Sequence, residues 1–140
     1  MSTHDLTQTQ ALALALNAEG NAAPEWIQLT PAGPDIQGRD GRAWTMTDPD
    51  AIVEAFRANK ADLPVDFEHA TQVKGEKGDP APAVGWIKEL ENRQGAIWAR
   101  VEWNSDGANA VLTKGYRYVS PVFSFTRTAG AITKMVSAGL

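Results

Sequence analysis

The spacing of apolar and polar residues along the chain predicts a protein built mainly from β-strands. The clearest run is residues 115–125, where aromatic and β-branched side chains alternate with polar ones. In a strand, one face of this segment carries core-type residues such as Val119 and Phe123, and the other face carries Ser120. The pattern therefore predicts a central strand that displays a serine on the face opposite the core.

Other segments repeat this pattern in shorter form. Residues 84–90 and 96–103 have alternating apolar positions on both sides of a Gly-containing connection, which is typical of a hairpin. The remaining strand-type segments are residues 25–30, 35–37, 42–46, 65–69 and 131–137. A total of about seven strands with a few peripheral helices predicts a β-rich α+β domain with a strongly bent sheet or a closed β-barrel.

Two short helices are predicted between the strands. The first begins at residues 47–50, because Thr47 or Asp48 can cap its N-terminus and Pro49 suits the first turn, and it ends near residue 60. The second follows the capping sequence of residues 104–106 and is closed by Gly115.

The chain divides into an N-terminal arm and one folded domain. Residues 1–23 are rich in Thr, Gln, Ala and Asn, which predicts a mobile arm with a weak helical tendency at residues 11–17. Residues 24–140 form the domain, which is long enough for one core. Within it, residues 71–80 belong to a long loop beside His69, and we expect this loop to border a cleft and to be poorly ordered without substrate.

Composition excludes several classes of protein. The net charge of −4 and the absence of a basic run argue against nucleic-acid binding. The chain has no cysteines, which removes disulfides and thiolate chemistry. No stretch approaches the length of a membrane span, and glycine motifs for nucleotides are absent, so we expect no membrane partner and no cofactor.

Ser120 and His69 are the candidate nucleophile and base. A serine attacks a carbonyl only with a base within hydrogen-bond reach, and His69 is the only histidine outside the arm. On the residues alone, the simpler interpretation is a polar serine on a half-exposed strand and a histidine at a strand end. A metal site of Asp66, Glu68 and His69 is disfavoured, because a regular strand would put its carboxylates on the face opposite the histidine.

Pro121 limits how an oxyanion could be stabilised. It follows Ser120 and has no backbone N–H, so the donor used by nucleophile-elbow hydrolases is missing. Other main-chain amides, a water, or the guanidinium of Arg117 or Arg127 would have to supply the stabilising charge.

From about Trp26 to Leu140 the sequence resembles the Mu-like prophage I proteins, the head-maturation proteases of Mu-type phages. The resemblance rests on the motifs VDFEH (65–69), VGWI (84–87), GAIWA (95–99), WNSDGA (103–108), YRYVSPVF (116–123) and ITKMVSA (132–138). The order of these motifs is also similar to that of the tailed-phage prohead proteases, which are related in fold and chemistry to the herpesvirus assemblins.

The resemblance implies a barrel-like serine protease with Ser120 as nucleophile and His69 as base. The resemblance does not identify the third residue of a catalytic triad. Asp66 is favoured, Glu68 and Glu102 are alternatives, and a Ser–His dyad also stays open because Lys134 and Met135 stand where some prohead proteases carry an acid.

The implied function is a serine endopeptidase that cleaves scaffold protein and itself during maturation of the phage head. Its expected partners are scaffold and capsid polypeptides, with an edge strand as one route to a homodimer, and its expected location is the assembling prohead in the host cytoplasm. A chain ending at Leu140 fits the protease part without the scaffold segment that follows it in such precursors. The alternative is a catalytically inactive β-barrel that acts as a scaffold- or capsid-interaction module.

Overall fold

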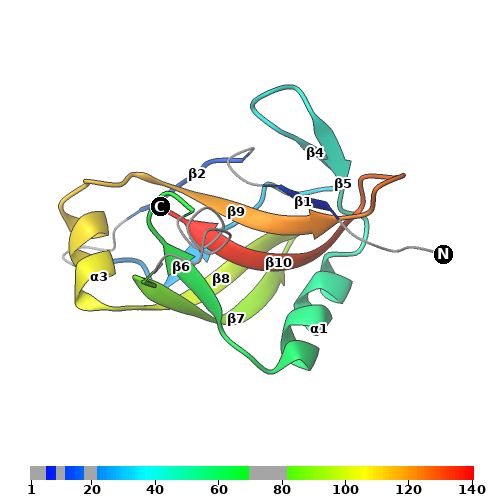
Figure 1. The fold of residues 1–140 in the computed structure, drawn as a ribbon. Helices are drawn as coiled ribbons and strands as arrows, with labels where there is room; N and C mark the ends of the chain where they lie inside the picture. The colour runs from blue at the N-terminus through cyan, green and yellow to red at the C-terminus, as the bar shows by residue number, and fades with distance from the viewer. Residues whose placement is uncertain (1–5, 9–11, 18–21, 70–81) are drawn as a thin grey trace.

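The computed structural model describes residues 6–8, 12–17, 22–69 and 82–140. Most of the strands belong to one sheet, which bends strongly and nearly closes on itself (Figure 1). Its strands are β1 (Leu6–Gln8), β2 (Leu14–Ala15), β3 (Trp26–Gln28), β6 (Leu63–Asp66), β7 (Gly85–Arg93), β8 (Ala96–Trp103), β9 (Tyr118–Phe125) and β10 (Ile132–Gly139). The β-rich α+β fold expected from the sequence is confirmed.

The order of the strands in the sheet brings distant parts of the chain together. It runs β1-β9-β10-β6-β7-β8-β3, and β2 also pairs with β9. All neighbours are antiparallel except β10 and β6, which are parallel. As a result, β9 and β6 flank the same strand, β10, although more than fifty residues separate them in the sequence.

Both helices begin where local signals predict, and α1 also ends there, whereas α3 ends at Leu112 with Thr113 as its C-cap and Lys114, rather than the predicted Gly115, as the left-handed residue that follows. α1 (Pro49–Asn59) has Asp48 at its N-cap, and its C-cap, Lys60, is left-handed. α3 (Ser105–Leu112) has Asn104 at its N-cap, and the Asn104 side chain accepts a hydrogen bond from the Gly107 N–H at 2.9 Å. α1 packs its buried residues Ile52 and Val53 toward β7 and β10. No helix in the described residues is long and apolar enough to cross a membrane.

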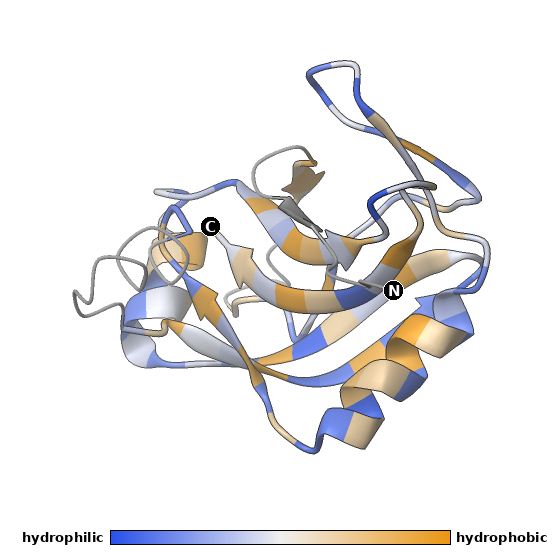
Figure 2. Cartoon of the chain, turned by 45° about the vertical axis from the view of Figure 1, so that its right-hand side comes forward, coloured by the Kyte–Doolittle hydropathy of each residue, from blue (hydrophilic) through white to orange (hydrophobic). Residues whose placement is uncertain are grey.

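The core fills the inside of the bent sheet. Its largest fully buried side chains include Phe123, Leu29, Ile36, Ile52, Ile87 and Ile97. Figure 2 shows the apolar and polar bands that alternate along β9, β10 and α1. A separate hairpin, β4 (Asp35–Gln37) and β5 (Ala43–Thr45), projects from the sheet and contributes Ile36 and Trp44 to the core.

Two predictions about local structure are wrong. The described part of residues 11–17 is not helical, because Leu14 and Ala15 form β2 and pair with Val119 and Tyr118 of β9. The predicted strand at residues 65–69 ends at Asp66 and continues as a turn. Strand pairing decides the first case, since a weak helical tendency is easily overridden by tertiary contacts.

Candidate functional site

A row of three residues crosses the sheet at the end of β9, β10 and β6. Gly139 of β10 pairs with Ser120 of β9 on one side and with Asp66 of β6 on the other. Paired residues on neighbouring strands point to the same face of a sheet. Ser120 and Asp66 therefore face the same side, with a residue that has no side chain between them.

The turn after β6 brings His69 back over this row. Glu68 and His69 have φ angles of 53° and 57°, in the left-handed region that residues other than glycine seldom adopt. Each such residue costs about 1–3 kcal/mol and persists only where the surroundings enforce it. The turn replaces the regular strand expected from the sequence, so the carboxylates and His69 are not separated onto opposite faces of a sheet.

His69 lies directly on Gly139. A Cβ built on Gly139 would stand 2.7 Å from His69 Nδ1 and 2.8 Å from His69 Cε1. The imidazole thus occupies the space that a side chain at position 139 would take. Since Gly139 is the direct cross-strand partner of Ser120, the ring lies over the strand next to Ser120.

Three contacts hold the turn in this position. Phe67 stacks on Tyr116, just before β9, with ring centroids 4.9 Å apart and planes at 22°. The backbone N–H of Leu140 donates to the Asp66 carbonyl at 2.8 Å, and the Glu68 N–H donates to the Leu140 carbonyl at 3.2 Å. The turn therefore contacts the segment just before β9 and the residue just after β10, next to the two strands that carry Ser120 and Gly139.

Ser120 and His69 line the same cavity, which has a volume of about 230 Å³. Its walls are formed by Ala13, Arg39, Glu68, His69, Tyr118, Val119, Ser120, Gly139 and Leu140. Ser120 Oγ and His69 Nδ1 are both buried, and neither has a hydrogen-bond partner within the described structure. A Ser120–His69 hydrogen bond is therefore not formed in this state, although the two groups share one small space.

The environment of His69 favours the neutral imidazole. Burial of the ring lowers its pKa from the ordinary value of 6.5, and the negative charge of Asp66 opposes this shift without cancelling it. The His69 residue is 3% exposed and Asp66 is fully buried. A neutral imidazole beside a buried carboxylate is the protonation state that a general base requires near pH 7.

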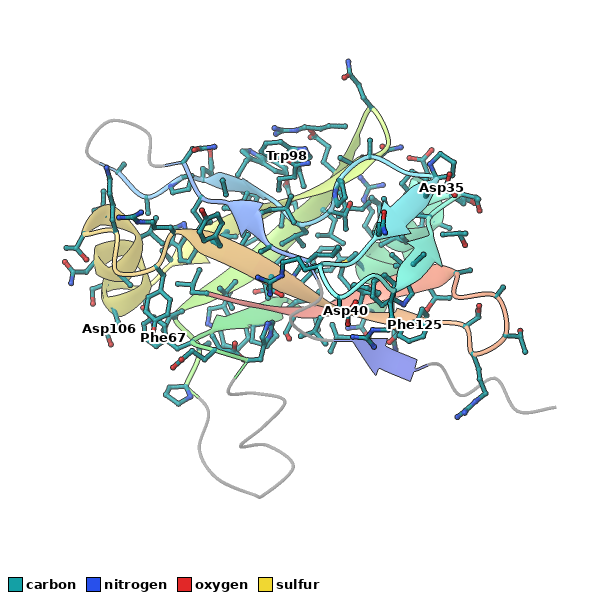
Figure 3. The ribbon with its side chains drawn as sticks, turned by 90° about the horizontal axis from the view of Figure 1, so that it is seen from above. Asp35, Asp40, Phe67, Trp98, Asp106 and Phe125 are labelled. Carbon is teal, nitrogen blue, oxygen red and sulfur yellow. The ribbon has the colours of Figure 1, made fainter. Side chains whose placement is uncertain are left out.

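The other expected site residues are distributed over several regions. Glu68 lines the cavity with His69. Glu102 is on the outer surface of β8, where its carboxylate lies 3.9 Å from Arg100, and it does not line the cavity. Arg117 lines a neighbouring cavity, and Arg127 is in the turn after β9. Figure 3 shows Phe67 near α3 and Phe125 toward the opposite end of the sheet, the end from which Arg127 follows.

Arg39 is a cavity residue that the sequence did not indicate. It lies in the turn between β4 and β5, a segment whose Gly-Arg-Asp-Gly sequence signals only a hairpin turn. Of the described residues that line the cavity, Arg39 alone carries a permanent positive charge. No local pattern could have associated it with Ser120, because the fold of the whole chain brings the hairpin over the sheet.

The described residues contain no group of three or more His, Cys, Asp or Glu side chains that could hold a metal ion. The loop at residues 71–80, expected to border the cleft, lies outside the described residues.

Comparison with known proteins agrees with the resemblance seen in the sequence. No curated protein and no solved structure matches the chain. The family model for the Mu-like prophage I protein, N-terminal domain, matches residues 27–140, which include most of β3, all of β4 to β10 and every residue of the row Ser120–Gly139–Asp66. The chain belongs to the family of Mu-like prophage I proteins, a phage-related family, and corresponds to its N-terminal domain.

Proposed function

We propose that this domain is a serine endopeptidase that cleaves scaffold and capsid polypeptides, and its own precursor, inside an assembling phage head in the bacterial host. The observation that supports this best is the arrangement of Ser120, Gly139 and Asp66 across three strands, with the His69 ring seated on the glycine. Serine, histidine and a buried carboxylate, gathered at one place in the sheet, are the groups that acyl transfer needs.

In the proposed reaction His69 acts as the general base. It takes the proton of Ser120 Oγ while the oxygen attacks the carbonyl carbon of the scissile peptide bond. When the C–N bond breaks, the same proton passes to the leaving amine. A water molecule, deprotonated by His69, then hydrolyses the ester and restores Ser120. The charge of Asp66 stabilises the imidazolium that forms in each half of the reaction.

Arg39 is the proposed source of positive charge for the oxyanion. Pro121 has no N–H to donate, so the stabilising group has to come from another element. Arg39 is favoured over Arg117 and Arg127, because it lines the cavity that contains Ser120 and they do not.

Labelling with a fluorophosphonate tests the proposal, since such reagents react with serines that a neighbouring base activates. We expect the full chain to be labelled at Ser120, Ser120→Ala to abolish labelling, and His69→Ala to slow it by about 10³-fold or more. In the same assay Arg39→Ala is expected to slow labelling by about 10²-fold, with Arg127→Ala as the unaffected control. Equal labelling of wild type and Ser120→Ala would contradict the proposal.

A second candidate function is an interaction module of the phage head without catalysis. The observation that favours it is that Ser120 Oγ has no hydrogen-bond partner among the described residues. Expression of the chain together with the scaffold polypeptide of the same prophage separates the two. A protease loses scaffold cleavage on Ser120→Ala, whereas a module keeps its association with the scaffold and produces no fragments in either form.

A further inference from the structure

The N-terminal arm lies along β9 beside Ser120. β2 is antiparallel to β9, with Leu14 opposite Val119 and Ala15 opposite Tyr118. The Leu16 N–H donates to the Arg117 carbonyl at 2.8 Å, in the same register. β1 pairs with the far part of β9, at Phe123 to Phe125. The described pairs of β1 and β2 therefore leave Ser120, Pro121 and Val122 outside both ladders.

The arm stands in a position that a peptide could occupy. β10 pairs with one edge of β9, and in the described sheet the other edge is paired only with β1 and β2. Without the arm, β9 would be an edge strand, whose unpaired N–H and C=O groups bind extended peptides by strand addition. Extended peptides are also the form in which a proteolytic site takes its substrate.

Side chains of the arm alternate along this edge. Leu12 is buried, and Leu14 and Leu16 pack against the core, whereas Ala15 is exposed. Continuing the register of β2 puts Ala13 opposite Ser120, and Ala13 does line the cavity that contains Ser120 and His69. A small residue thus faces the serine, with leucines on either side of it directed inward.

The cavity beside Ser120 is small while the arm is in place. Its volume of about 230 Å³ is below the roughly 300–1,000 Å³ of ordinary ligand sites. Beyond Tyr118, a second cavity of about 610 Å³ continues along the arm, lined by Ala15, Leu16 and Asn17 on one side and by Lys114 and Arg117 on the other. Tyr118 belongs to both cavities, so the two cavities are neighbours along the arm.

We infer that the edge of β9 at Tyr118 and Val119 is the binding site for an extended peptide with leucine-like residues at alternate positions and a small residue facing Ser120, and that residues 12–16 of this chain occupy it. The inference rests on the proposed function and adds its substrate class. The arm competes with the substrate, and Ser120 becomes accessible when the arm leaves β9.

A reversible cross-link tests this most directly. Because the pair Leu16–Arg117 is hydrogen-bonded, the pair Ala15–Tyr118 is the non-hydrogen-bonded type, with Cα atoms about 4.5 Å apart, which suits a disulfide. The chain has no other cysteine, so in Ala15→Cys/Tyr118→Cys only these two thiols can pair. Oxidation is expected to slow fluorophosphonate labelling of Ser120 at least 10-fold relative to the reduced form of the same variant, with wild type unchanged by the oxidant. Equal labelling of both forms would overturn the inference.

A second variant covers the case in which the cysteines do not pair. Leu14→Asp puts a charge at a core-facing position of the arm and is expected to release it, raising the labelling rate about 3- to 10-fold. Leu112→Asp makes the same chemical change at an exposed leucine of α3 and is the matched control, expected to stay within twofold of wild type. Equal rates for the two variants would show that the arm does not block the serine.

A third measurement does not depend on catalysis. In a Ser120→Ala background, a fluorescent peptide with the sequence of residues 12–17 is expected to bind the reduced double-cysteine variant and not the oxidised one. If this difference is found but no form of the chain labels at Ser120, the binding site stands and the protease proposal fails. If labelling occurs and peptide binding is the same in both forms, the protease proposal stands and the arm inference fails.

Discussion

The β7–β8 hairpin and the meeting point of β6, β9 and β10 belong to one sheet but differ in how well local rules explain them. The hairpin turn, Gln94-Gly95, has φ angles of 53° and 92°, as a two-residue hairpin turn of the right twist requires. Asn92 Oδ1 accepts the Gly95 N–H at 2.8 Å, so the turn is hydrogen-bonded within itself. The Arg93 guanidinium sits 4.7 Å from the ring centroids of both Trp26 and Trp98.

The other region has the same backbone conformation without a local reason. Glu68 and His69 are left-handed although no tight hairpin demands it. Ser120 Oγ and His69 Nδ1 are buried with no hydrogen-bond partner among the described residues, and a buried polar group left without a partner costs about 1–3 kcal/mol. Departures from local rules that cluster at one place mark a functional site more often than an accident of packing. The comparison predicts that changes in this region affect reactivity more than stability, and that changes in the hairpin do the reverse.

The largest effect is expected from the carboxylate next to His69. Asp66→Asn keeps the shape of the side chain but removes the charge that stabilises the imidazolium, and we expect labelling or peptide cleavage to fall about 10²- to 10⁴-fold. Glu68→Gln is the matched change in the same turn and should lower the rate less than about tenfold. A greater loss for Glu68→Gln than for Asp66→Asn would identify Glu68 as the third member instead.

A smaller effect is expected from the glycine under the imidazole. Gly139→Ala places a methyl group within 2.7 Å of the present position of His69 Nδ1, so the ring has to move, and we expect a rate about 10- to 10²-fold lower. The comparison change in the hairpin is Gly95→Ala, which has room for a methyl group but a φ of +92°. It should lower the free energy of unfolding by about 1 kcal/mol and leave the rate unchanged. If Gly139→Ala reacted at the wild-type rate, the expected difference between the two regions would be contradicted.

The smallest effect concerns the pH dependence of stability. His69 has a lowered pKa in the folded protein, so as pH falls below about 6.5 the unfolded chain takes up this proton first and the free energy of unfolding decreases. The decrease is absent above that pH, and it levels off below the folded-state pKa. Denaturant titrations between pH 8 and pH 5 should therefore show a shallower loss of stability for His69→Gln than for wild type. Parallel curves would mean that His69 is equally easy to protonate in both states.

The two helices and the β7–β8 hairpin could be predicted because their signals are local. Asp48 and Asn104 cap helices from positions next to them in the sequence, and the hairpin connection contains its own glycine. The strand at Tyr118–Phe125 was also predicted, from alternation alone. Alternation predicted only one buried face for this strand, the face of Val119 and Phe123. In the structure Val122 and Ser124, on the same face as Ser120, are buried as well.

The rest of the site could not be predicted because it depends on contacts between distant segments. The VDFEH motif has the alternation of a strand, and the left-handed turn at Glu68 and His69 exists because Phe67 stacks on Tyr116 and the backbone bonds to Leu140. In the sequence Arg39 is only a turn residue, and it reaches the cavity because of where the fold places the β4–β5 hairpin. The N-terminal residues have too little local preference to reveal a strand, and they form one because β9 offers an edge.

The sequence by itself determined the strand that carries Ser120 and the strand that leads to His69, because apolar periodicity, caps and turn residues act over a few positions. Only the tertiary structure decided what faces the serine. Gly139 can pair with both Ser120 and Asp66 only because β10 runs between β9 and β6. The His69 ring can lie on Gly139 only because this residue has no side chain. The strand order is set by the burial of all the apolar faces of the sheet together, so it cannot be predicted from any single segment of the sequence.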